Sequence, residues 1–149
     1  MSDVYFPSWL LEVDTIFKSE FVGFKHAVEL YDFALEMHNT HSSKCMQGAL
    51  ITGDVKLKIA RGLYLPVLEE RYAQNAVLKK ITVSHMSTSQ GEYKAIDVSV
   101  FKECVIQNIQ HDMHFVEFSC MFVQYEHRTC NAQSNHACVS MSFKKGARV

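Results

Sequence analysis

The order of its segments constrains the fold of this 149-residue chain more than any other feature. Stretches in which apolar and polar residues alternate are interrupted once, by a short segment with helical spacing, and two long alternating stretches follow. Alternation with a period of two is typical of strands, whereas apolar residues three and four apart are typical of a helix. The sequence therefore predicts a mainly β protein with one short helix.

The clearest predicted strand is Asp54–Ile59, where Val55, Leu57 and Ile59 alternate with two lysines. Residues 38–53 before it are polar and small, and they predict a long loop. Residues 26–37 alternate as a strand does, but their Ala, Leu, Glu and Met content also favours a helix, so both readings stay open there. The remaining predicted strands are residues 8–13, 79–86, 93–109, with a bulge near 101–103, 114–127 and 137–143.

The predicted helix runs from Pro66 to about Leu78. Proline suits the first turn of a helix, where its missing N–H has no partner to lose. Leu65, Leu68, Tyr72 and Ala76 follow at helical spacing and form one apolar stripe. About seven strands and one helix indicate a single domain over residues 1–149, a small β-barrel or two-sheet sandwich with one flanking α-helix.

Composition and charge exclude several classes of function. The net charge is −1, which does not favour a nucleic-acid partner. The sequence contains no apolar run of the length of a transmembrane helix and begins with no recognisable signal peptide, so we expect no membrane insertion and folding in the cytoplasm. Five cysteines, an odd number, predict free thiols in a reducing compartment.

The stretch from Phe115 to Tyr125 carries large apolar residues on both predicted faces. Val116, Phe118, Cys120 and Phe122 alternate on one face. A strand in an antiparallel sheet normally turns one face to water, so the second face is expected to meet the helix or a neighbouring subunit. That second face supplies the candidate lateral interface residues Met121, Val123 and Tyr125, with core packing as the alternative for Tyr125.

Two further sets of residues are candidate sites. The predicted loop supplies candidates for stacking contacts between copies: Thr40, His41, Lys44, Cys45 and Met46. The second set has the imidazole and thiolate groups that zinc prefers: His111, His114, Cys130, His136 and Cys138. The chain contains no Cys-x-x-Cys pair, and we expect neither a metal nor any other cofactor.

The sequence gives little support for catalysis. A nucleophilic arrangement of Cys120, His114 and Asp97 is conceivable, but no local sequence typical of such enzymes surrounds these residues. The phosphate-binding, nucleophile-elbow and metalloprotease motifs are absent as well. The sequence therefore predicts a protein that is not an enzyme and has no catalytic residue.

Several of these runs, taken in order, resemble the hemolysin-coregulated protein (Hcp) family, the inner-tube proteins of bacterial type VI secretion systems. The strongest are Glu92–Val98 and the run ending Val123-Gln-Tyr-Glu126, both after the helix. The ending differs, because residues 130–149 are rich in Cys and His and lack the Gly-Trp-Asp type of tail seen in many members. The other runs that carry the resemblance are 30–37, 54–59, 66–78, 80–83 and 115–122.

The resemblance implies a barrel of two sheets with a flanking helix, and a structural role without catalysis. It implies a homo-hexameric ring whose stacked copies form a hollow tube within a contractile sheath. The tube is propelled into a target cell with a spike or tip protein, sometimes with effector proteins in its lumen, so the subunit leaves the cell without a cleaved signal peptide and serves virulence. The alternatives are a monomeric binding or chaperone-type β-barrel, and a Cys/His metal-binding protein.

Overall fold

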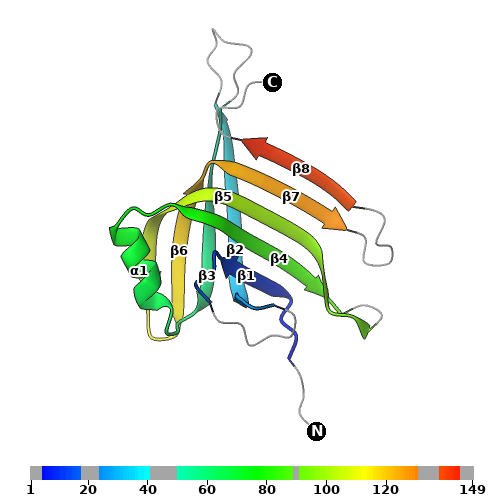
Figure 1. The fold of residues 1–149 in the computed structure, drawn as a ribbon, viewed down its shortest axis with the longest axis horizontal. Helices are drawn as coiled ribbons and strands as arrows, with labels where there is room; N and C mark the ends of the chain where they lie inside the picture. Colours follow the sequence, from blue (N-terminus) through cyan, green and yellow to red (C-terminus); the bar gives the residue numbers. More distant parts are fainter. Residues whose placement is uncertain (1–4, 18–23, 41–49, 89–90, 131–137, 145–149) are drawn as a thin grey trace.

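The computed structural model describes residues 5–17, 24–40, 50–88, 91–130 and 138–144, with residues 38–40, 50–52, 130 and 138–144 described by their backbone alone. Eight strands and one helix follow one another along the chain (Figure 1). They are β1 (Trp9–Val13), β2 (Ala27–Thr40), β3 (Leu50–Ala60), α1 (Leu65–Ala73), β4 (Leu78–Ser87), β5 (Lys94–His111), β6 (Phe115–Phe122), β7 (Gln124–Cys130) and β8 (Cys138–Lys144).

The strands form a closed antiparallel barrel with an extension. Their order is β4-β1-β2-β3-β6-β5-β7-β8, and β4 also pairs with β5, which closes the first six strands of that order into a barrel. Strands β7 and β8 continue the sheet beyond the barrel, as Figure 1 shows in orange and red. The predicted fold class, a small β-barrel with one flanking helix, is confirmed.

Strand β5 connects two parts of the sheet, the part that contains β4 and β7 and the part that contains β6. The first part of β5 pairs with β4 and β7, and its last part pairs with β6. The transition lies at Glu103, whose backbone φ is 54°. The pairing with β4 keeps its register at this point, and the register shifts of β5 lie near residues 96 and 107, so the bulge expected near 101–103 is wrong in position. A left-handed residue turns the strand sharply, so β5 leaves one sheet and enters the other at this point.

The same transition divides the stretch predicted as one strand over 114–127. That prediction is wrong: β6 ends at Phe122, β7 begins at Gln124, and Val123 separates them. The N–H of Val123 donates to the carbonyl of Lys102 at 3.2 Å, so the opposite strand holds this interruption in place. The alternation of inward and outward side chains shifts by one residue at Val123, so Phe122 and Tyr125, three positions apart, both face the core.

The barrel interior is apolar and well buried. Val55, Leu57 and Ile59 of β3 are fully buried, as the alternation predicts, and so are Val116 and Cys120 of β6. A smaller cluster of Leu10, Ala27 and Met86 lies on the outer side of β1, β2 and β4 and is covered by Phe24 and Tyr93. Burial of apolar surface of this extent is the main stabilising contribution in a domain of this size.

The helix is shorter than predicted. It ends at Ala73 rather than near Leu78, because Asn75 takes a left-handed conformation with φ 50° that a helix cannot continue through. Leu65 and Leu68 face the barrel, whereas Tyr72 is largely exposed, so the expected apolar stripe covers only the first turns. Figure 1 shows α1 beside the barrel. Among the described residues no helix has the length and apolar character needed to cross a bilayer.

Residues 26–37 form a strand and not a helix, and the loop predicted over 38–53 is shorter. Strands β2 and β3 pair from Leu30 and Ile59 up to Thr40 and Leu50, which leaves only residues 41–49 between them. Only the two ends of the predicted loop, residues 38–40 and 50–53, lie within the pairing, and Gly53 is one of these residues. A Cβ on Gly53 would lie 2.3 Å from the Phe122 ring, so this strand position needs a glycine for the close approach.

Candidate functional site

The outer face of the sheet formed by β4, β5 and β7 is a candidate assembly surface. Ser99 and Phe101 of β5 are buried inside, so Val98 and Val100 point outward, where they are half-buried. Cross-strand partners share a face, and they place polar side chains on both sides of the two valines. The two rows across the sheet are Ser84, Val98 and Arg128, and Thr82, Val100 and Glu126.

This surface has an apolar centre and a charged border. Lys102 Nζ lies 3.5 Å from Glu126 Oε2 at one side. Thr82 and Ser84 on this face are buried, at 8% exposure each, and the two valines are half-buried. An apolar centre with a polar rim is the usual anatomy of a protein–protein interface. The sequence pattern showed the alternation of residues 96–100 but not that the valines lie on the outer face.

One of the three residues expected to form a lateral interface, Tyr125, lies in the core. Tyr125 is 5% exposed, and its ring stacks on Phe101 at 5.0 Å between centroids, so its assignment to the surface is wrong and core packing is correct. The reason is the interruption at Val123, which shifts the alternation by one residue. Met121 is 38% exposed on the outer side of β6, and Val123 is half-buried at the interruption.

The residues expected to make stacking contacts lie almost wholly outside the described part of the chain. Thr40 is the last residue of β2, with only its backbone described. His41, Lys44, Cys45 and Met46 are outside the described residues. Their role as stacking contacts stays a prediction.

At the opposite end of the barrel, the β5–β6 turn and the segment before α1 lie within the described residues. Ala60 pairs with Phe115 at this end of β3 and β6, whereas Gly53 pairs with Phe122 toward the other end. Two large apolar side chains stand almost free at this end, Leu63 at 100% and Met113 at 84% exposure. They are carried by the segment before α1 and by the β5–β6 turn.

The β5–β6 turn is held by Asp112. Its Oδ1 accepts the backbone N–H groups of His114 and Phe115, each at 2.8 Å, and these two bonds hold the pKa of the Asp112 carboxyl below its usual range. Lys58 lies with its Nζ 4.6 Å from the centroid of the Phe115 ring, a cation–π contact. The carboxylate is therefore structural: it fixes the turn.

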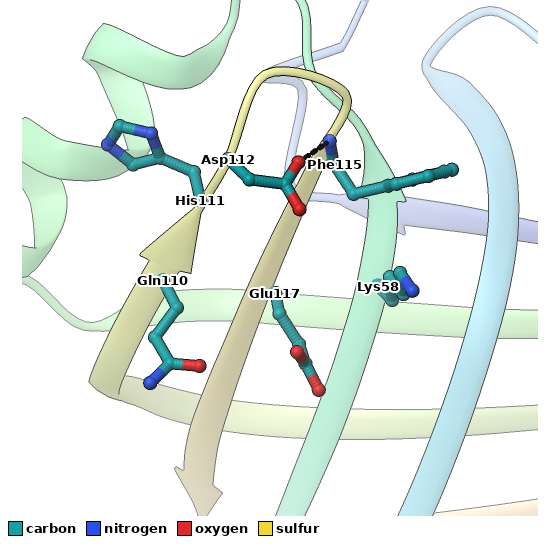
Figure 2. A pocket seen from close by; sticks show the side chains of 6 residues that line it. All are labelled: Lys58, Gln110, His111, Asp112, Phe115 and Glu117. Atoms are coloured by element: carbon teal, nitrogen blue, oxygen red, sulfur yellow. Dashed lines mark hydrogen bonds between the residues drawn. The ribbon is translucent and has the colours of Figure 1, made fainter.

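A shallow, open depression of about 460 Å³ lies beside this turn (Figure 2). It is lined by Lys58, Gln110, His111, Asp112, Phe115 and Glu117. Its charged groups already have partners, since Glu117 pairs with Lys56 at 3.0 Å and Asp112 caps the turn. The depression therefore lacks the enclosed, mostly apolar walls that are typical of a small-molecule site.

The proposed metal ligands are not brought together among the described residues. His111 contacts Arg61 and Glu69, and His114 belongs to the exposed turn. Cys130 and Cys138 face each other in the β7–β8 register, but their side chains are not described, and His136 lies outside the described residues. Within the described part of the chain, no group of three or more His, Cys, Asp or Glu residues is arranged to hold a metal ion.

The conceivable cysteine nucleophile is not supported. Cys120 is fully buried in β6, and burial raises the pKa of its thiol, so a thiolate is disfavoured. Cys104 is also fully buried, and burial raises its pKa to about 12. Both behave as small apolar residues of the core.

The structure brings together a row of polar and aromatic residues that the sequence pattern did not predict as a group. On the inner face near the end of the barrel, Trp9 stacks on His85 at 4.3 Å, and Asp97 is the cross-strand partner of His85. Nε2 of His127 lies 2.5 Å from Asp97 Oδ1. The only sequence signal for this row was the presence of polar residues at inward positions of strands.

Comparisons with solved structures find the same architecture in proteins of type VI secretion systems. Hcp1 from Salmonella typhimurium superposes with a TM-score of 0.74 at 11% identity over 95% of this chain and 97% of that chain. The secreted protein Hcp3 from Pseudomonas aeruginosa gives 0.72 at 14% identity over 92% and 99%. A structure described as a type six secretion system protein gives 0.76 at 10% identity over 97% and 100%.

No family model and no curated protein matches the sequence. Identities of 9–14% establish a shared fold and do not by themselves establish a shared activity. The chain therefore has the Hcp fold over nearly its whole length.

Proposed function

We propose that this chain is a ring-forming structural subunit of a type VI secretion tube. In this proposal six copies form a ring, the rings stack into a hollow tube, and the tube is propelled into target cells. The observation that carries the proposal is the fold, which matches proteins of these systems over at least 92% of this chain and 97% of theirs in the three comparisons above.

The outer face around Val98 and Val100 supports the lateral part of the proposal. A closed ring needs a heterologous interface, in which one surface patch of each copy meets a different patch of the next. Val98 and Val100, half-buried on the outer face of this sheet, are suited to be part of one of these patches. Met121 and Val123 on the other sheet are the remaining candidates for the second patch.

The axial part of the proposal follows from the polarity of the barrel. The β2–β3 connection lies at one end, and Leu63 and Met113 lie at the other. A second heterologous interface between unlike ends does not close on itself and produces a stack. Thr40, His41, Lys44, Cys45 and Met46 remain our candidates for the first of these ends.

The proposed partners follow from the same role. They are further copies of the chain, a contractile sheath, a spike or tip protein and effector proteins carried in the lumen. The subunit would fold in the cytoplasm and be translocated by the secretion system itself. We propose neither a catalytic activity nor a cofactor, consistent with the buried, protonated thiols of Cys104 and Cys120.

Electron microscopy of negatively stained protein tests the proposal together with three variants. The wild-type chain is expected to give annular particles. Val98→Asp places a charge on the outer sheet face and should abolish them, whereas Val77→Asp, a matched change at an exposed position after α1, should leave them intact. Val123→Asp decides whether the interruption between β6 and β7 also belongs to the interface.

Two outcomes would overturn parts of the proposal. Annuli that survive Val98→Asp and Val123→Asp, with unchanged folds by circular dichroism, would remove both lateral assignments. A wild-type chain that stays monomeric at every concentration would favour the alternative of a monomeric binding barrel.

A further inference from the structure

Strand β8 carries a cysteine directly opposite a cysteine of β7. Cys130 is the last residue of β7, Cys138 is the first residue of β8, and the two are cross-strand partners in the antiparallel register. The pairing continues without a register shift as far as Gln124 and Lys144 at the other end of this hairpin (Figure 1). Seven partner pairs therefore place Cys130 opposite Cys138.

The spacing of opposite residues in an antiparallel pair matches what a disulfide needs. Their Cα atoms are about 4.5 or 5.5 Å apart, depending on whether the pair exchanges hydrogen bonds, and disulfides bridge Cα atoms about 4.4–6.8 Å apart. Opposite Cβ atoms are generally about 4.5–5.5 Å apart, whereas a disulfide prefers about 3.5–4.5 Å. Closing such a bond therefore draws two strands together, and a bond under this strain is readily reduced again.

The other cysteines of the barrel do not compete for this pairing. Cys104 and Cys120 are fully buried inside the barrel, whereas β7 and β8 continue the sheet beyond it. The fifth cysteine, Cys45, lies outside the described residues. A link from Cys45 to one of the two partners is therefore the alternative that an experiment has to distinguish.

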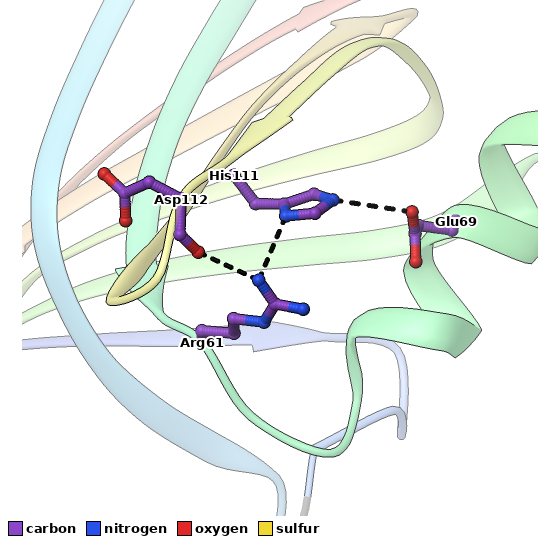
Figure 3. A network of polar contacts seen from close by, with 4 residues as sticks. All are labelled: Arg61, Glu69, His111 and Asp112. Carbon is purple, nitrogen blue, oxygen red and sulfur yellow. Dashed lines mark hydrogen bonds and ion pairs between the residues drawn. The ribbon is translucent and has the colours of Figure 1, made fainter.

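The imidazole that was considered with these cysteines as a metal ligand lies at the other end of β5. Strand β7 pairs with the first part of β5, where Thr129 is opposite Asp97. His111 is the last residue of β5, and its ring lies between Arg61 and Glu69 (Figure 3). The cysteine pair is therefore separate from this imidazole.

We propose that Cys130 and Cys138 are a redox-sensitive pair, which forms an intramolecular disulfide under oxidising conditions and fastens β8 to β7. The oxidant is a small-molecule disulfide such as oxidised glutathione. One cysteine attacks it and forms a mixed disulfide, which releases one glutathione thiol, and the second cysteine then displaces the other. The chain gives up two electrons and two protons, and the oxidant leaves as two thiols.

The consequence of the bond follows from the place of β8 in the sheet. Strand β8 is the last of the strand order, and in the part of the chain that the structure describes it pairs with β7 alone. A strand held on one side opens more easily than a strand inside a sheet. The disulfide restrains this opening at the end of the hairpin where Cys130 and Cys138 lie.

Oxidation of the full chain with oxidised glutathione, with a chelator present, tests the pair. The mass of the denatured, non-reduced chain should fall by about 2 Da, because two hydrogens are lost. Peptide mapping without reduction should find Cys130 linked to Cys138, and dithiothreitol should remove the link. Hydrogen exchange in a peptide covering residues 139–144 should slow about two-fold or more after oxidation, because opening of the hairpin is restrained.

A variant that moves one cysteine by a single position separates strand register from closeness in sequence. Cys138→Ser combined with Val139→Cys keeps two thiols at almost the same separation along the chain, but adjacent positions of a strand point to opposite faces. In the folded protein this double variant should form its link about ten-fold more slowly than the wild type, because its thiols are not positioned to react. In urea the two rates should agree within about two-fold, since loops of nearly equal length are closed.

Several results would overturn the proposal. They are a wild-type map without the link between Cys130 and Cys138, a map in which Cys45 is the partner, and a link that joins two copies, which the mass of two chains would reveal. A folded double variant that links as fast as the wild type would overturn it as well, and so would unchanged exchange of residues 139–144.

Circular dichroism shows whether the double variant is folded. If it is not, the wild-type rates with and without urea decide the same question, because a link that forms as fast in urea does not depend on strand register. The mass and the map are read on denatured chains, so they do not depend on whether the chain forms rings.

Discussion

At the scale of single residues, two tyrosines show how a buried hydroxyl affects stability. The Tyr64 hydroxyl is buried and has no hydrogen-bond partner among the described residues, and burial raises its pKa to about 12. The Tyr93 hydroxyl donates to the Pro7 carbonyl at 2.7 Å. The two residues therefore form a matched pair.

Tyr64→Phe should leave stability unchanged or raise it by up to about 1 kcal/mol, because the ring keeps its edge contact with Phe17 while an unsatisfied polar group is removed. Tyr93→Phe should cost about 1 kcal/mol, because it leaves the Pro7 carbonyl without its donor. Urea unfolding of both variants measures the difference. A loss at Tyr64 as large as that at Tyr93 would mean that the Tyr64 hydroxyl has a partner.

Cys104 and Cys120 should resist modification in the folded protein. Burial raises both thiol pKa values, that of Cys104 from 9.0 to about 12, so neither is a thiolate at pH 8. Alkylation followed by peptide mapping should find both unmodified until the chain is unfolded. Rapid labelling of either in native protein at pH 8 would contradict their placement in the core.

The same pKa shifts predict a loss of stability in alkali. Above about pH 9 the unfolded chain gives up the thiol protons, whereas the folded chain keeps that of Cys104 until about pH 12. The folded state then binds more protons, and the free energy of unfolding falls as the pH rises. Cys104→Ala should show a smaller decline between pH 9 and pH 11 than the wild type in urea titrations.

At the scale of elements, the left-handed residue Glu103 turns β5 from one sheet into the other. Glu103→Gly should change stability by less than about 1 kcal/mol, because glycine adopts this conformation freely. Glu103→Val should cost about 1–3 kcal/mol, since a β-branched side chain strains the same backbone. Thermal unfolding of the two variants is the measurement, and equal stability would show that β5 bends without this conformation.

The Asp112 turn should make part of the stability dependent on acid. The pKa of its carboxyl is lowered by the bonds from Phe115 and His114, so its contribution is present above about pH 4 and is lost as the pH falls through the lowered value. Asp112→Ala should therefore unfold at a lower temperature than the wild type at pH 6. The two melting temperatures should converge as the pH falls below about 4, and a constant difference would contradict this role for the charge.

The alternation of apolar and polar residues correctly predicted the strands in which one face is apolar and the other is polar. Val55, Leu57 and Ile59 alternate with lysines, and they lie in the core as predicted. The pattern failed where long-range strand pairing, or the backbone conformation of one residue, determines where an element begins or ends. Gly53 and its small neighbours suggested a loop, but pairing with β2 and β6 draws them into β3. Asn75 and Val123 end elements that side-chain periodicity would have continued.

The candidate site was harder to predict than the fold for the same reason. The direction of Val98 and Val100 depends on where β5 changes sheets, and Tyr125 lies inward because the alternation of side chains shifts by one residue at Val123. A pattern with a period of two names the two faces but does not say which is the core when both carry apolar groups. The cluster of Arg61, Glu69 and His111 joins residues up to 50 positions apart, which only the closed barrel brings together.

At the scale of the whole molecule, the proposed function depends on the assembly of several copies. A barrel of this size can fold alone, and in the proposed ring the half-buried Val98 and Val100 on the outer face would be covered by another copy. The two unlike ends of the barrel would then add a direction along which rings stack. A monomer would leave both features without a role.

Val98→Asp tests this claim inside the folded molecule. The charge lies on the outer face, where it should cost little in the monomer but should prevent burial against a neighbour. The variant should remain folded by circular dichroism and elute as a monomer, and Val77→Asp should elute as the wild type does. A Val98→Asp chain that keeps the wild-type mass would show that this face is not an interface.

The most direct measurement is the mass of the wild-type chain by light scattering coupled to size exclusion, over a wide range of protein concentrations and with reductant present. The account predicts a species of about six times the 17.1 kDa of one chain, which dissociates only on dilution. A mass of one chain at every concentration would contradict the ring.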